Sequence, residues 1–129
     1  MRLLIVDDER AVAESMAAIF RLAGHEPYFA ISPVEGLALA RKVQPQLLIT
    51  DVVMPGQTGI ELAINIQKIL PNCKVLLMSG QAETSNLIDQ AENQGYCFEI
   101  VAKPIWPPDL IDMAVRIVNQ PNSEAAGAS

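Results

Sequence analysis

Short apolar segments alternate along the chain with longer segments of helical periodicity. The short segments are rich in Leu, Ile and Val, and the longer ones repeat their apolar residues every three to four positions. This alternation predicts an α/β domain in which helices cover both faces of a parallel sheet. The five expected strands are Leu3 to Val6, Pro27 to Ala30, Leu47 to Thr50, Lys74 to Met78 and Phe98 to Ala102.

The expected strands differ in how continuous their apolar character is. Four are nearly continuous, which is typical of strands buried on both faces of a sheet. The segment from Pro27 to Ala30 is short and begins with a residue that has no backbone N–H. We therefore expect it to be an edge strand.

Start and stop signals predict five helices. The clearest start is Ser32-Pro33-Val34-Glu35, in which Ser caps a backbone N–H, Pro fits the first turn and Glu follows three residues after the cap. Gly24 and Gly95 are expected C-terminal stops. One helix is expected around Val12, Met16, Ile19, Phe20 and Ala23, and a second from Ser32-Pro33 onwards. The others are expected at about Ile60 to Leu70, at about Glu83 to Gln94, and from after Pro107-Pro108 to near Asn119.

Length and composition limit the classes of protein. A chain of 129 residues suits one domain, and the last residues, NQPNSEAAGAS, carry no apolar stripe, so we expect a domain over residues 1–119 and a mobile tail over residues 120–129. The net charge of −6 argues against direct binding to nucleic acid or an anionic membrane. No apolar stretch suits a signal peptide or a membrane span, so we expect a cytoplasmic protein.

Polar side chains follow four of the expected strands. Asp7 and Asp8 come after the first strand, Asp51 after the third, Ser79 after the fourth and Lys103 after the fifth. Because ligands of open α/β sheets bind beyond the carboxyl ends of the strands, we expect these groups to share one rim. The carboxylates and the ammonium sum to −2, which a divalent cation would neutralise, and Mg²⁺ prefers such oxygen ligands.

Each of these residues also has a structural explanation when it is taken alone. Asp7 and Asp8 could cap the first helix, and Asp51 and Ser79 could form turns or caps. Lys103 could be an ordinary surface residue. Their joint position at one end of the sheet favours a functional site.

Four motifs resemble those of one known family. VDDE stands at Val6 to Glu9, LLITDVVMPGQTG at Leu47 to Gly59, LLMSG at Leu76 to Gly80 and AKP at Ala102 to Pro104. In order and spacing they resemble the receiver domain of two-component response regulators, from Arg2 to Asn119. The resemblance implies a flavodoxin-like, doubly wound fold with strand order 2-1-3-4-5.

The resemblance also implies a function for the rim. Asp51 would accept a phosphoryl group from a histidine kinase or a histidine phosphotransfer protein, and Ser79 and Lys103 would contact the phosphoryl oxygens. The implied Mg²⁺ ligands are Asp7, Asp8, Asp51 and the backbone carbonyl of Val53. The Lys103-Pro104 peptide bond is expected to be cis. The protein would be a single-domain signalling module that catalyses only its own phosphorylation and dephosphorylation.

The sequence departs from the family at the position of the usual aromatic switch residue. Ile100 stands where the family has Tyr or Phe, so the usual coupling of that ring to Ser79 is in doubt. Trp106 and Ile111 are large apolar residues that lie outside the one buried stripe expected for the last helix. They indicate either burial on two sides or a contact face, formed by the fourth helix, the fifth strand and the fifth helix, for a downstream protein or a homodimer.

Other functions remain as alternatives. A receiver-like scaffold that works without phosphorylation would agree with Ile100. A small Mg²⁺-dependent aspartyl phosphohydrolase would share the carboxylates, but the usual Asp-x-Asp after the first strand and an insertion for a substrate cap are absent. An FMN-binding flavodoxin is disfavoured because no phosphate loop rich in Ser, Thr and Gly follows the first strand.

Overall fold

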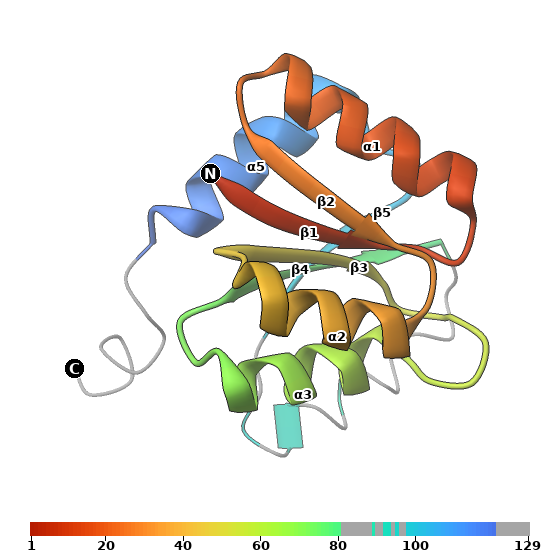
Figure 1. The fold of residues 1–129 in the computed structure, drawn as a ribbon. Coiled ribbons are helices and arrows are strands. Elements are labelled where there is room, and N and C mark those ends of the chain that lie inside the picture. Colours follow the sequence, from red (N-terminus) through yellow and green to blue (C-terminus); the bar gives the residue numbers. More distant parts are fainter. Residues whose placement is uncertain (81–88, 90–91, 94, 96–97, 121–129) are drawn as a thin grey trace.

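The chain folds into a parallel sheet with helices on both faces (Figure 1). The computed structural model describes residues 1–80, 89, 92–93, 95 and 98–120. The five strands are in the order β2-β1-β3-β4-β5, which confirms the flavodoxin-like topology. The described elements are β1 (Arg2–Val6), α1 (Arg10–Leu22), β2 (Glu26–Ala30), α2 (Pro33–Val43), β3 (Leu47–Asp51), α3 (Gly59–Ile69), β4 (Lys74–Ser79), β5 (Glu99–Ala102) and α5 (Pro107–Val118).

Two expectations concern parts of the chain that are not described. The helix expected at about Glu83 to Gln94 lies mostly outside the described residues, and so does the tail after Gln120. The other four expected helices are present, and the observed ends of α3 lie within one residue of the expected Ile60 and Leu70.

Two apolar cores lie on opposite faces of the sheet. In Figure 1, α1 and α5 cover one face, and α2 and α3 cover the other. Phe20 of α1 and Leu110 of α5 pack with strand residues such as Ile5 on the first face. Leu62 and Ile66 of α3 belong to the core on the second face. Successive strand residues point to alternate faces, so the continuous apolar strands supply both cores.

Side-chain caps fix the starts of α2 and α3. The Ser32 hydroxyl accepts a hydrogen bond from the Glu35 N–H (3.2 Å), as the sequence predicts, and Pro33 occupies the first turn. Thr58 accepts from the Glu61 N–H (3.1 Å) and donates to the Glu61 carboxylate (3.3 Å). These bonds satisfy backbone donors that a helix start leaves free. At the end of α1, Gly24 adopts the expected left-handed conformation, with φ of +91°.

The two outer strands differ in how they present their edges. β2 is an outer strand, as Pro27 predicts. Glu26 N–H donates to Met1 O, and Ala30 O accepts from the Asp7 N–H, so residues 26 and 30 bond to β1. Because strand residues alternate, the backbone of Pro27 faces the open side, where it offers no N–H.

The expectation that the segment from Phe98 to Ala102 is buried on both faces was wrong. Only Glu99–Ala102 is paired, and Glu99, Ile100 and Ala102 are exposed. The reason is its position at the end of the strand order, where it has a neighbouring strand on one side only.

Among the described helices, none is long and apolar enough to cross a membrane.

Candidate functional site

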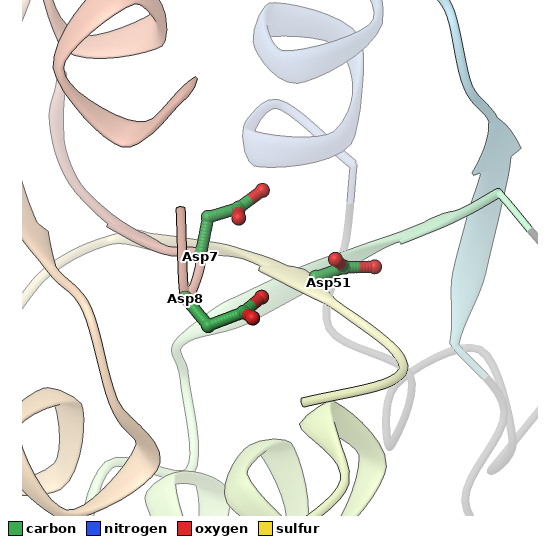
Figure 2. Close-up of side chains that lie close together, drawn as sticks. All are labelled: Asp7, Asp8 and Asp51. Atoms are coloured by element: carbon green, nitrogen blue, oxygen red, sulfur yellow. The ribbon is translucent and has the colours of Figure 1, made fainter. Parts of the chain in front are cut away.

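Three carboxylates meet at the carboxyl ends of β1 and β3. Figure 2 shows Asp7 and Asp8 in the segment directly after β1, beside Asp51 at the end of β3. One carboxylate oxygen from each residue lies within 4.8 Å of those from the other two. β1 and β3 are neighbours in register, with Val6 opposite Thr50, so the residues that follow them are brought side by side. The structure therefore brings together the acidic residues that the sequence placed on one rim.

Asp7 is held by contacts with both of its carboxylate oxygens. It is only 3% exposed, its Oδ1 accepts from the Glu9 N–H (2.9 Å), and its Oδ2 faces the Lys103 ammonium at 3.2 Å. The N-cap residue of α1 is Glu9, which makes no capping bond with its side chain. Neither Asp7 nor Asp8 is thus the N-cap of α1, and the explanation of both as helix caps was wrong.

Lys103 bridges two of the carboxylates. Its Nζ lies 3.1 Å from Asp51 Oδ2 and 3.2 Å from Asp7 Oδ2. Its own N–H donates to Ser79 O (2.8 Å), which ties the residue after β5 to the end of β4. The Lys103-Pro104 peptide bond is cis, as the resemblance implies. Asp7, Asp8, Asp51, Ser79 and Lys103 therefore all lie at the same end of the sheet.

The pKa shifts of Asp51 and Lys103 follow from burial and from neighbouring charges. Burial raises the pKa of Asp51 above its ordinary value; Lys103 works against this rise, and the negative charges of Asp7 and Asp8 add to it. For Lys103, burial alone would lower the pKa, but its hydrogen bond and attraction to Asp51, together with Asp7, prevail and raise it. Lys103 therefore stays protonated. The three carboxylates together carry more negative charge than this one ammonium offsets.

This donor set fits a hard divalent cation. Three carboxylate oxygens converge within one ion's reach, and Asp7 and Asp51 are mostly shielded from water, with side chains 4% and 16% exposed. Mg²⁺ binds through one or two carboxylates and completes its shell with water and phosphate oxygens. Within the described part of the chain, this is the one group of three or more acidic, His or Cys side chains that could hold a metal ion.

The sequence did not reveal how closely the start of α3 approaches Asp51. A Cβ at Gly59 would lie 1.9 Å from Asp51 O, so only glycine fits. The buried Thr50 hydroxyl donates to the same carbonyl oxygen (3.1 Å). A signal for Thr50 was present, because it is a polar residue inside an otherwise apolar strand.

The remaining predicted residues lie at different places. Val53 is 41% exposed, two residues after Asp51. Ile100 is 38% exposed on β5, opposite Leu77 of β4. Trp106, just before α5, is 68% exposed, whereas Ile111 packs partly buried against the core formed with α1. Ile111 thus contributes to that core, whereas Trp106 lies at the surface.

Known proteins share this sequence pattern and this fold. The family model described as response regulator receiver domain matches residues 3–115. A response regulator receiver protein of Anaeromyxobacter sp. (strain Fw109-5) is 34% identical over 112 residues, which cover 87% of this chain and 46% of that protein. The DNA-binding transcriptional regulator NtrC of Azospirillum brasilense is 30% identical over 124 residues, which cover 96% of this chain and 25% of that protein.

A solved structure supports the same assignment. The receiver domain protein (CheY-like) of Methanospirillum hungatei JF-1 has a TM-score of 0.82 and 30% identity, and the match covers 92% of this chain and 93% of that one. This chain spans less than half the length of the two curated relatives above. On the family match, the shared fold and the site at the end of the sheet, the chain belongs to the response regulator receiver domain family.

Proposed function

We propose that residues 1–119 form a phosphoacceptor domain that takes a phosphoryl group onto Asp51 in a Mg²⁺-dependent reaction. The donor would be a phosphohistidine of a histidine kinase or of a histidine phosphotransfer protein, in the cytoplasm. The observation that carries this proposal is the convergence of Asp7, Asp8 and Asp51 within 4.8 Å, with the Lys103 ammonium 3.1 Å from Asp51. Membership of the receiver family supports it.

In the proposed reaction, an Asp51 oxygen forms a bond to phosphorus as the bond between phosphorus and the imidazole nitrogen breaks. The imidazole leaves with the electron pair of that bond. Asp51 suits this role because it lies at the end of β3 and its side chain, although mostly shielded, keeps 16% of its surface exposed. Lys103 lies within reach of an oxygen on Asp51 and would attract the negative phosphoryl oxygens. Ser79 at the end of β4 would donate its hydroxyl to one of them.

The chain provides the ligands for a metal ion at this site. Asp8 and Asp51 would bind Mg²⁺ directly, Asp7 directly or through water, and the Val53 carbonyl would complete the protein ligands. When bound, Mg²⁺ supplies positive charge that offsets the carboxylates and draws electron density from the phosphoryl oxygens. Asp7, fixed by the Glu9 N–H, holds its side of the cluster in place.

We further propose that phosphorylation is read by a downstream protein. The acyl phosphate adds about one negative charge to a site that already carries excess negative charge. The exposed Trp106 lies three residues beyond Lys103 in the chain and belongs to the proposed contact face with Ile111 of α5. The same face is a candidate for a homodimer contact.

One experiment tests the phosphoacceptor function. The protein is incubated with Mg²⁺ and acetyl phosphate, or with beryllofluoride, and followed by intact mass and by Trp106 fluorescence. We expect one phosphoryl adduct, lost in Asp51→Asn and retained in Asp109→Asn, a matched change at an acidic residue in the first turn of α5.

Two other results would favour the alternatives. Repeated turnover of small phosphate esters would indicate an aspartyl phosphohydrolase. No adduct and no change of fluorescence would favour a scaffold that works without phosphorylation.

The contact face has its own test. Replacing Trp106 and Ile111 with Ser should weaken binding of the phosphorylated protein to itself or to its partner. Unchanged self-association by sedimentation, together with unchanged partner affinity, would exclude this face.

A further inference from the structure

The backbone that follows Asp51 is fixed by hydrogen bonds to two other elements. The Val52 N–H donates to Met78 O of β4 (3.0 Å), and Val52 O accepts from the Gly59 N–H at the start of α3 (2.8 Å). Because a peptide group is planar, the second bond also fixes the N–H of Val53. The loop from Val52 to Thr58, which we call the acceptor loop, is therefore closed by a bond from its first residue to the first residue of α3.

Gly59 allows this closure because it has no side chain. A Cβ at this position would lie 1.9 Å from Asp51 O and 2.9 Å from Asp51 C, and these backbone atoms cannot move without moving the acceptor residue. Gly59 does not have a positive φ, so the close approach of two backbones requires glycine here, rather than an unusual conformation. Any side chain would push α3 away from the end of β3.

Thr50 holds the same carbonyl from the other side. Its side chain is fully buried, and its Oγ1 donates to Asp51 O at 3.1 Å. The hydroxyl would lie 3.0 Å from a Cβ at Gly59, so Thr50, Asp51 O and Gly59 form one contact group. Asp51 O and Val52 O, the two carbonyls that precede that of Val53, thus both accept hydrogen bonds.

We propose that Thr50 and Gly59 are positioning residues that make the site selective for Mg²⁺. They hold the backbone from which the Val53 carbonyl projects, so that this carbonyl and the Asp51 carboxylate keep a fixed relative position. Mg²⁺ demands nearly ideal octahedral geometry, whereas Ca²⁺ accepts flexible sites, so a rigid loop favours the smaller ion. This inference rests on the proposed function, because it takes the Val53 carbonyl as a ligand.

The test compares the affinities for the two metal ions alone, by isothermal titration calorimetry, in wild type and in three variants. Thr50→Val keeps the shape of the side chain and removes the donor, and Gly59→Ala introduces the clash. Ile66→Val is the matched control, because it loosens the core under α3 and leaves Thr50, Gly59 and every residue of the acceptor loop unchanged. Circular dichroism shows which variants fold. If Gly59→Ala does not fold, the metal-ion affinities of Thr50→Val alone test the inference.

We expect the affinity for Mg²⁺ to fall by about tenfold or more in Gly59→Ala and by several-fold in Thr50→Val, as for other residues that orient metal ligands. The affinity for Ca²⁺ should fall less, so that the preference for Mg²⁺ narrows, and Ile66→Val should keep both affinities. Affinities for Mg²⁺ within about twofold of wild type in the folded variants, or equal losses for both ions, would overturn the inference. Wild-type protein that binds no Mg²⁺ would instead overturn the proposed function itself.

Discussion

Replacing Lys103 with Met removes the cation that bridges Asp7 and Asp51 in the carboxylate cluster. Lys103 Nζ lies 3.1 Å from Asp51 Oδ2 and 3.2 Å from Asp7 Oδ2. With an effective dielectric constant of about 20, each attraction is worth about 5 kcal/mol. Two carboxylates 4.8 Å apart, the upper limit in this cluster, repel each other by about 3.5 kcal/mol. The two attractions thus roughly balance the three repulsions, and Met leaves the repulsions unopposed.

The loss of stability in Lys103→Met has an upper limit, because a carboxyl group can take up a proton instead. Protonating an ordinary Asp at pH 7 costs about 4 kcal/mol. We therefore expect the metal-free variant to lose up to about 4 kcal/mol of its free energy of unfolding at pH 7. For a chain of this length, such a loss lowers the melting temperature by up to about 15 °C.

The pH dependence of this loss provides a second measurement. Above its unfolded-state pKa, a carboxyl whose folded pKa is raised destabilises the fold, and the cost disappears as pH falls through the folded pKa. The difference in free energy of unfolding between Lys103→Met and wild type should therefore become smaller as the pH is lowered from 7 to 4. Added Mg²⁺ should also reduce it, because the ion supplies the missing positive charge.

The assay is thermal unfolding followed by circular dichroism, with EDTA or with Mg²⁺, at several pH values. Lys42→Met is the matched control, because Lys42 is exposed in the last turn of α2 and its loss should cost less than about 1 kcal/mol. The electrostatic reasoning is refuted if Lys103→Met has the same melting temperature as wild type in EDTA at pH 7. A loss that is the same at pH 4 and pH 7 would also refute it.

Three further predictions concern single residues. Asp51→Asn should raise the stability of the metal-free protein at pH 7, because the raised pKa of Asp51 means that its charge is costly in the fold; thermal unfolding should show this gain vanishing as pH falls through that pKa. Burial raises the pKa of Cys73 to about 12, so in a Cys97→Ser background iodoacetamide at pH 8 should label the thiol only after unfolding, as mass spectrometry would show. Ser32→Ala should cost about 1 kcal/mol in urea unfolding, because the Glu35 N–H loses its cap, and an unchanged midpoint would contradict this.

The rim could be predicted from the sequence because parallel strands bring their carboxyl ends to one edge. Asp7 and Asp51 directly follow two expected strands, so parallel strands place both side chains on one rim, and the strand order implied by the resemblance makes the two strands neighbours. The position of Lys103 followed in the same way from β5. The pairing of Lys103 with two particular carboxylates depends on the path of the loop after β5 and could not be predicted from spacing.

Contacts between segments that are distant along the chain could not be predicted from the sequence. Gly59 could be expected in a turn, but its closeness to Asp51 O depends on where α3 begins relative to the end of β3. The exposure of β5 was missed because its apolar residues indicate burial, whereas the strand order implied by the resemblance already places this segment at an edge of the sheet.

Pro27 has a consequence for how copies of this protein meet. The backbone of Pro27 faces the open side of β2, where another chain adding a strand would require an N–H donor. A strand added there would have one carbonyl group, opposite Pro27, that finds no N–H donor on β2. The edge formed by β2 is thus protected against sheet growth between molecules, the route by which many folded proteins begin to aggregate. The domain can therefore be present at high concentration without polymerising through this edge.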